Sequence, residues 1–138
     1  MRVVVDTPVW SLALRRKASD LAPGERRISQ LLHQIIEEGR AQLLGPIRQE
    51  LLSGLREDAQ FRRLRDYLRD FPDTMLATAD YEEAARASNQ CRKAGIANTT
   101  VDMLICAVSL HHGWLIFSTD LDFVKYASVI PVQMLSVA

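Results

Sequence analysis

Apolar positions along the chain change their spacing several times, and each change marks the expected end of one element and the start of the next. Short runs of consecutive apolar residues, such as the valines at 3–5, are typical of strands buried on both faces. Segments with apolar residues every three or four positions are typical of helices with one buried face. The patterns predict strands at residues 2–5, 42–44, 75–78, 114–117 and 131–135, and helices at residues 7–17, 23–39, 46–55, 58–71, 80–95 and 101–112, with a short helix from 122.

This alternation of strands and helices predicts an α/β fold. Strands joined by helical crossovers form a mainly parallel sheet with helices on both faces, which is a three-layer α/β/α sandwich. No linker or repeat interrupts the pattern, so we expect a single domain over residues 1–138. In sheets of this kind, ligands bind beyond the carboxyl ends of the strands.

Composition narrows the possible classes of protein. Hydrophobic residues make up 48% of the chain and the formal net charge is zero, which excludes a disordered segment and a polycation. The charge is uneven, because residues 1–69 carry a net +4 and residues 70–138 a net −4. Two cysteines form no metal-ligand motif, and no apolar run approaches the roughly 18 residues of a membrane span. We therefore expect a cytoplasmic protein that does not cross a membrane.

Four acidic residues are predicted to meet at one edge of the sheet. Asp6 ends the first strand, and Asp120 follows the strand at 114–117. Glu50 lies in the first turns of the helix after Pro46, and Asp102 begins an otherwise apolar helix. Each acid alone has an ordinary explanation as a helix cap, a turn residue or a solvated side chain. Together they predict a shared site.

Several carboxylates at one edge repel each other unless they are protonated or bind a cation. Carboxylate oxygens without a cluster of Cys or His suit Mg²⁺ or Mn²⁺ better than Zn²⁺. A cation of this kind favours hydrolysis of phosphodiesters, because it activates water and neutralises developing charge. The residues themselves thus favour a metal-dependent phosphodiesterase.

The chain also resembles a known family. The segments around Asp6, Glu50, Asp102 and Asp120 look like those of PIN-domain ribonucleases, in the same order, and most like the VapC toxins of toxin–antitoxin pairs. The resemblance covers almost the whole chain. It departs mildly at Cys106, where the family usually has an alanine.

The resemblance implies a PIN-like fold and a Mg²⁺- or Mn²⁺-dependent endoribonuclease activity. The four acids match the family's acidic positions, and Asp122 matches a frequent additional acid. Thr7 and Thr119 match polar residues near the metals. A cognate antitoxin and a homodimer are also implied. The helices at residues 22–39 and 46–70 either only cover the sheet or also form the groove that receives the antitoxin.

Other interpretations remain open at this stage. Arg15, Arg16 and Lys17 either bind RNA phosphates or are solvated at the end of a helix. The chain as a whole is alternatively a non-catalytic protein- or RNA-binding α/β domain. A metal-dependent DNA nuclease or a phosphatase is a third possibility, although Pro8 stands where an aspartate phosphatase would have its second acid.

Overall fold

A small parallel sheet forms the centre of the molecule in the computed structural model, which describes residues 1–137. Its strands are β1 (Val3–Val5), β2 (Ala41–Gln42) and β3 (Leu115–Phe117), in the order β2-β1-β3. All pairings are parallel. The three valines of the central strand have no exposed surface. Central parallel strands covered on both faces need such uniformly apolar residues.

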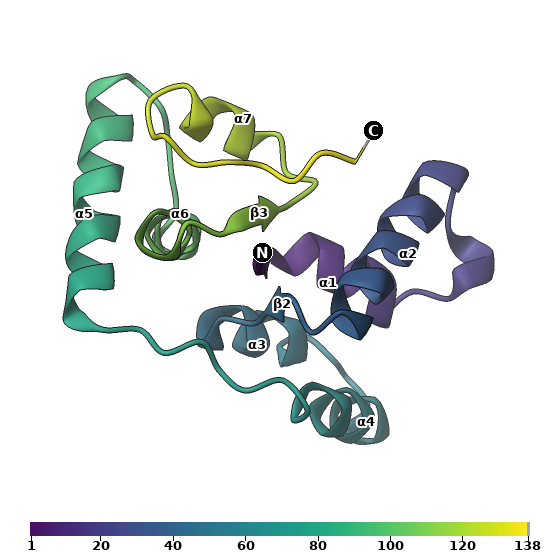
Figure 1. Ribbon diagram of the computed structural model, residues 1–138. Coiled ribbons are helices and arrows are strands. Elements are labelled where there is room, and N and C mark those ends of the chain that lie inside the picture. The colour runs from purple at the N-terminus through teal and green to yellow at the C-terminus, as the bar shows by residue number, and fades with distance from the viewer. Residues whose placement is uncertain (138) are drawn as a thin grey trace.

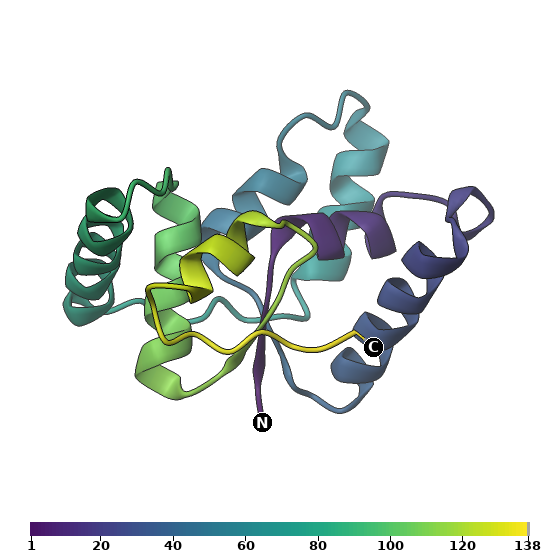
Figure 2. The ribbon, with the colours of Figure 1, turned by 90° about the horizontal axis from the view of Figure 1, so that it is seen from above.

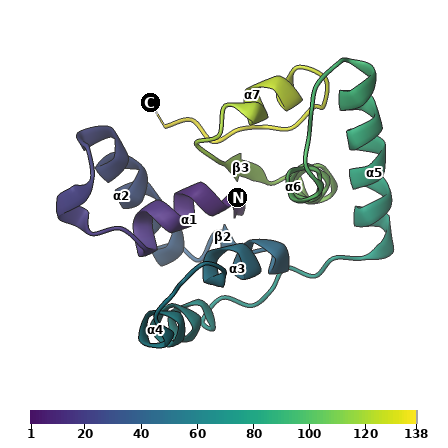
Figure 3. The ribbon, with the colours of Figure 1, turned by 180° about the vertical axis from the view of Figure 1, so that it is seen from behind.

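Helices cover both faces of this sheet, as the sequence predicts. α1 (Thr7–Leu14) and α2 (Pro23–Glu37) lie on one side, and α5 (Thr78–Lys93) and α6 (Thr100–His112) lie on the other (Figure 1). The view from behind gives the same division (Figure 3). α3 (Gly45–Leu52) and α4 (Asp58–Leu68) follow β2, and α7 (Asp122–Ala127) follows β3. A 3-10 turn, Ala18–Asp20, joins α1 to α2. The α/β/α arrangement is confirmed.

Local sequence signals fix where the helices beside the strand ends begin. Asp6 caps α1 by accepting a 2.8 Å hydrogen bond from the Thr7 backbone N–H, and Pro8 occupies the first turn. The Thr99 side chain caps α6 by accepting a 3.1 Å bond from the Asp102 backbone. Gly113, with φ of 68°, ends the same helix in the left-handed conformation that glycine tolerates. These caps place the two acids at helix starts.

The strand predicted at residues 75–78 is wrong. In the described part of the chain, the only β pairing near this segment is an isolated bridge between Leu43 and Asp73, which lies before it in the sequence. Met75 is 85% exposed, unlike a residue of a buried strand. Thr78 already belongs to α5. The reason is the Asp80 carboxylate, which accepts a 2.8 Å hydrogen bond from the Ala77 backbone N–H and so starts the helix two residues before the predicted position.

The strand predicted at residues 131–135 is also wrong, because only a bridge between Ile116 and Met134 forms there. Ile116 donates to the Gln133 carbonyl at 2.9 Å and accepts from Leu135 at 2.7 Å. A tight turn, in which Val132 donates to the Ile130 carbonyl, bends the chain before a longer ladder can form. In residues 1–137, no helix is both long and apolar enough to span a membrane.

The carboxyl ends of the strands share one edge with several helix starts. In Figure 2, β1 rises from the N-terminus to the purple helix α1, and the yellow-green segment leading into α7 lies at the same edge. The first turn of α6 is there as well. This is the edge at which the sequence predicts the acidic site.

Candidate active site

A cleft of about 510 Å³ opens at the carboxyl ends of β1 and β3. It gathers the four acids predicted to share a site, and the additional acid as well. The residues lining it are Asp6, Thr7, Pro8, Ser11, Glu50, Thr99, Thr100, Val101, Asp102, Asp120 and Asp122. Residues separated by up to 116 positions in the sequence therefore meet in one cavity.

Asp6 is the most buried acid of the cleft, with 5% of its surface exposed. It directly follows β1, and its backbone N–H donates a 2.9 Å hydrogen bond to the Phe117 carbonyl of β3. One carboxylate oxygen accepts the capping bond from Thr7, and the other accepts a 2.7 Å bond from the Ser118 hydroxyl. Its carboxylate is thus held at both oxygens.

Glu50 approaches from α3 on the other side of α1. The Thr7 hydroxyl donates a 3.1 Å hydrogen bond to a carboxylate oxygen of Glu50. Glu50 is otherwise exposed, so this contact orients a side chain that would have many rotamers in water. Thr7 therefore links the first acid to the second, through its backbone and its hydroxyl respectively.

Asp102 occupies the first turn of α6 and is partly exposed. Its carboxylate accepts a 2.7 Å hydrogen bond from the hydroxyl of Tyr126, a residue of α7 that is almost fully buried. The carboxylate also benefits from its place at the N-terminus of the helix, where backbone N–H groups favour negative charge.

Asp120 and Asp122 complete the acidic wall. The Ser118 hydroxyl accepts a 3.0 Å bond from the Asp120 backbone N–H, and the Asp120 carboxylate accepts a 2.9 Å bond from the Asp122 backbone N–H. This loop brings carboxylate oxygens of Asp102, Asp120 and Asp122 within 4.8 Å of one another. Three oxygen donors so close together suit one divalent cation.

Charge in the cleft is almost entirely negative. Its lining contains no Lys, Arg or His, and Lys125 reaches Asp122 only from outside, at 3.8 Å. The pKa of Asp6 is raised from 3.8 to about 6, because burial, aided by the nearby charges of Asp102 and Asp120, outweighs the hydrogen bonds from Ser118 and Thr7. Burial, with Asp120 and Asp122 nearby, also raises the pKa of Asp102 against the Tyr126 hydrogen bond. A cation in the cleft would relieve this repulsion.

Sequence reasoning missed two residues that orient the acids of the cleft. Ser118 hydrogen-bonds both the Asp6 carboxylate and the Asp120 backbone N–H. Its position two residues before Asp120 was a signal that could have identified it. Tyr126 orients Asp102 but looks like an ordinary apolar helix residue. Thr119, predicted to lie near a metal, is exposed and does not line the cleft. Its predicted role has no support in this geometry.

The three consecutive basic residues Arg15, Arg16 and Lys17, which were expected either to bind RNA phosphates or to be solvated, have different surroundings. Arg16 forms a 2.6 Å ion pair with Glu25 and donates to the Asp20 carbonyl at 3.3 Å. Lys17 is exposed beside the 3-10 turn. Arg15 lines a second groove, between α1 and α4. None of the three lines the acidic cleft.

Comparisons with solved structures find the same fold. The crystal structure of FitAcB from Neisseria gonorrhoeae has a TM-score of 0.75 and 19% identity, covering 98% of this chain and 97% of that one. VapBC2 from Rickettsia felis, bound to a DNA fragment from its promoter, has a TM-score of 0.70 and 9% identity, covering 98% of both chains. A toxin–antitoxin complex from Klebsiella pneumoniae has a TM-score of 0.69 and 14% identity, covering 99% of this chain and 98% of that one.

A comparison with curated proteins found no match to this sequence. The family model described as the PIN domain matches residues 3–129. That range includes the whole sheet, the four acids of the cleft, Asp122 and the tyrosine that orients Asp102. The chain therefore belongs to the PIN-domain family.

Proposed function

We propose that this protein is a Mg²⁺- or Mn²⁺-dependent endoribonuclease that hydrolyses RNA phosphodiester bonds. The observation that carries the proposal is the cleft at the carboxyl ends of β1 and β3, in which five carboxylates meet without a basic side chain in the lining. PIN domains are in general nucleases, which supports the hydrolytic class. The preference for RNA and the metal dependence are the new parts of the proposal.

The donor set fits a hard divalent cation. All candidate ligands are carboxylate oxygens, and three of the acids, Asp102, Asp120 and Asp122, already approach one another to within 4.8 Å. Neither free cysteine lines the cleft, because Cys91 and Cys106 are buried elsewhere. Asp6 and Glu50 line the same cleft and would complete the ligand set. When bound, Mg²⁺ or Mn²⁺ would orient a water, lower its pKa and neutralise charge on the phosphate.

The residues around the acids orient them and govern their protonation. Ser118 and the Thr7 backbone hold both oxygens of Asp6, while the Thr7 hydroxyl and Tyr126 orient Glu50 and Asp102. Carboxylates must be deprotonated to bind a cation, so the raised pKa of Asp6 couples cation binding to proton release. In the hydrolysis, water adds to phosphorus and the P–O bond to the leaving sugar breaks. No side chain needs to act as a nucleophile.

We further propose that the protein acts as the toxin of a toxin–antitoxin pair, with an antitoxin partner and a homodimeric assembly. The support is that the solved structures with this fold include toxin–antitoxin complexes and match the chain over nearly its whole length. A cytoplasmic location, which suits the two free cysteines, belongs to the same proposal.

Cleavage of total RNA by the purified chain tests the nuclease proposal. We expect discrete fragments with Mg²⁺ or Mn²⁺, none with EDTA, and none from Asp120→Asn or Asp6→Asn. The matched control is Asp58→Asn, which removes an exposed acid paired with Arg62 on α4. Full activity in the cleft variants would overturn the assignment of the site.

Thermal melting separates the catalytic interpretation from a non-catalytic binding domain. A cation that binds only the folded state increases the free energy of unfolding by RT ln(1 + [L]/Kd) and so raises the melting temperature. We expect Mn²⁺ to stabilise the wild type and Asp58→Asn but not Asp120→Asn. No stabilisation together with no cleavage would favour the binding domain. Cleavage of single-stranded DNA alone, or of a phosphomonoester alone, would replace RNA as the substrate.

A further inference from the structure

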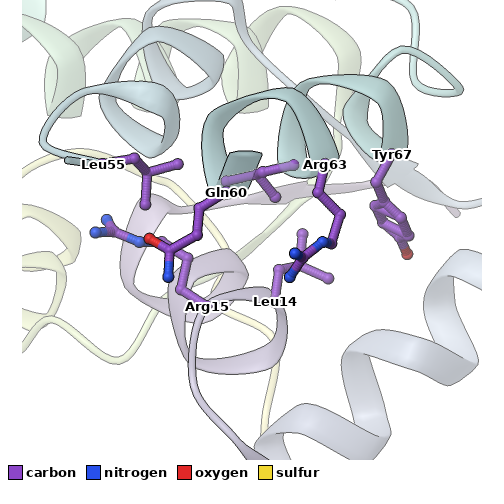
Figure 4. Close-up of a pocket in the computed structure, with 7 residues that line it drawn as sticks. Leu14, Arg15, Leu55, Gln60, Arg63 and Tyr67 are labelled. Atoms are coloured by element: carbon purple, nitrogen blue, oxygen red, sulfur yellow. The ribbon is translucent and has the colours of Figure 1, made fainter. Parts of the chain in front are cut away.

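A second groove lies about two turns along α1 from the acidic cleft. It has a volume of about 390 Å³ and separates the end of α1 from α4. Its lining residues are Leu14, Arg15, Leu55, Gln60, Arg63, Leu64 and Tyr67. In Figure 4, Gln60 and Arg63 extend from α4 toward Arg15 and Leu14, and Tyr67 lies beside Arg63. Leu64 belongs to the hydrophobic core, but neither the core nor the proposed catalytic site accounts for the arginines of this groove.

The groove is positively charged. Its lining contains two arginines and no carboxylate. Within residues 1–137, neither Arg15 nor Arg63 forms an ion pair, and both are exposed. The adjacent arginines do form ion pairs, Arg16 with Glu25 and Arg62 with Asp58. The two arginines that face the groove are therefore available to bind an anion.

The groove and the cleft border the same helix, α1. Thr7 and Ser11 line the cleft, while Leu14 and Arg15 line the groove. These positions are spaced by three or four residues, so they lie on one face of α1. At 1.5 Å per residue, Thr7 and Arg15 are about 12 Å apart along the helix. One extended strand can therefore contact both places.

We propose that this groove binds the phosphate backbone of single-stranded RNA a few nucleotides from the bond that is cleaved, an inference that rests on the function proposed above. Guanidinium groups bind phosphate oxygens through paired N–H donors. Tyr67 offers an exposed ring beside them, on which a base can stack. The cleft itself repels polyanions, so a basic contact at its end compensates for that repulsion.

An acidic peptide has the same charge as RNA, but the position of groove and cleft on one face of α1 favours RNA. A substrate strand must pass through the acidic cleft and continue somewhere, and α1 leads it to the arginines. An acidic peptide confined to the groove has no need of that path. Binding of polyglutamate to the same residues is nevertheless included as an outcome of the test.

The first test measures binding of fluorescent decauridylate to the full chain in EDTA, by anisotropy, so that cleavage plays no part. The test variant is Arg15→Gln/Arg63→Gln. The control is Arg62→Gln/Arg69→Gln, which removes the same charge from two paired, exposed arginines, one in α4 and one at its C-cap. We expect roughly tenfold weaker binding for the test variant and little change for the control. The slope of log K against log salt should fall by about 1.4, because two phosphate contacts are lost.

The second test measures cleavage with Mn²⁺ for a decanucleotide and for the dinucleotide UpU. A dinucleotide in the cleft is too short to reach the groove. We expect the test variant to raise KM severalfold for the decanucleotide, without a change in kcat, and to leave the dinucleotide unaffected. Unchanged melting temperatures would confirm that both variants fold.

The results distinguish the failure of each proposal. Cleavage of RNA with equal binding and equal KM in the test variant and the control would overturn the groove proposal while the nuclease proposal survives. Absence of cleavage by the wild type, with RNA binding lost only in the test variant, would overturn the nuclease proposal and support the groove. Loss of polyglutamate binding without loss of RNA binding would also overturn the assignment to RNA.

Discussion

The hydroxyl of Tyr126 donates a 2.7 Å hydrogen bond to Asp102, and this contact connects α7 to the first turn of α6. Both helices border the cleft, and Tyr126 is 1% exposed. Because a buried ring has a fixed position, the hydroxyl fixes the orientation of the carboxylate. Burial and the bond to Asp102 together raise the pKa of the tyrosine well above its usual value, so it remains a donor at all working pH values.

Replacing this tyrosine tests whether the orientation matters. We expect Tyr126→Phe to fold, to bind Mn²⁺ about tenfold or more weakly and to cleave RNA correspondingly more slowly. Titration of the melting temperature with Mn²⁺ measures the affinity. Tyr81→Phe, at an exposed position of α5, is the control. An unchanged Mn²⁺ affinity in Tyr126→Phe would show that Asp102 does not need the contact.

The raised pKa of Asp6 predicts an unusual dependence of stability on pH in the absence of metal. The carboxyl is more readily protonated in the folded state, at a pKa of about 6 against 3.8. Its contribution is therefore fully present below 3.8 and is lost as the pH rises through about 6. In EDTA, we expect Asp6 to stabilise the protein by roughly 1–3 kcal/mol more at about pH 4 than at about pH 7.5.

Asp6→Asn should flatten this part of the pH profile and be at least as stable as the wild type near neutral pH, since the uncharged amide removes the buried charge. Asparagine also remains a good helix cap. Asp20→Asn, at an exposed position, should keep the profile of the wild type. Urea melts at several pH values in EDTA measure the difference. A profile of Asp6→Asn parallel to that of the wild type would contradict the assigned pKa.

The contact between Asp80 and His111 joins the ends of α5 and α6 away from the cleft. Asp80 is 5% exposed, and its oxygens accept bonds from the Ala77 backbone and from Nδ1 of His111, at 2.8 and 2.5 Å. Burial raises its pKa, but these two partners outweigh burial and lower it overall. The stabilisation is therefore present above 3.8 and is lost as the pH falls through the lower folded value.

We expect Asp80→Ala to reduce the free energy of unfolding by about 1–3 kcal/mol, since it removes a helix cap and a buried charged hydrogen bond. Cleavage of RNA at a temperature where the variant is folded should not change. Glu82→Ala, two residues further along α5 and exposed, is the control and should have little effect. Equal stability of the two variants would show that the contact contributes nothing.

Arg48 anchors the segment between α4 and α5 to α3. Its guanidinium donates to Asp73 at 2.7 Å, to the Leu68 carbonyl at 2.9 Å and to the Phe71 carbonyl. We expect Arg48→Met to lose about 2–3 kcal/mol, because backbone carbonyls are left without a donor. Chemical denaturation measures the loss. Arg86→Met, at a side chain that is 75% exposed, is the control, and an equal loss there would contradict this account.

Helix positions and the acidic edge were predictable because local residues determine them. Pro8, Pro46 and Gly113 mark helix ends through their own backbone restrictions, whatever the rest of the fold does. An acid directly after a buried strand is placed at the sheet edge by the parallel topology. For this reason Asp6 and Asp120 could be assigned to one cleft from sequence.

Features that depend on distant partners were not predictable. Residues 131–135 have the composition of a strand, but they pair only around Ile116. The error at residues 75–78 has a local cause instead, because Asp80 caps a helix there. The hydrogen bond of Tyr126 depends on the packing of α7 against α6. Arg15 and Arg16 are adjacent residues of the same type, so the sequence does not distinguish them. In the part of the chain that the structure describes, Arg16 forms an ion pair with Glu25 and Arg15 does not.

The strand order has a consequence for the synthesis of the chain. β1 is made first, yet its partner β3 comes more than a hundred residues later, and Asp120 follows it. A nascent chain therefore lacks one edge of its sheet and one wall of its cleft until translation is nearly complete. The carboxylates can assemble only after long-range closure, which is a slow step in folding. The complete cleft is thus absent during most of the synthesis of the chain.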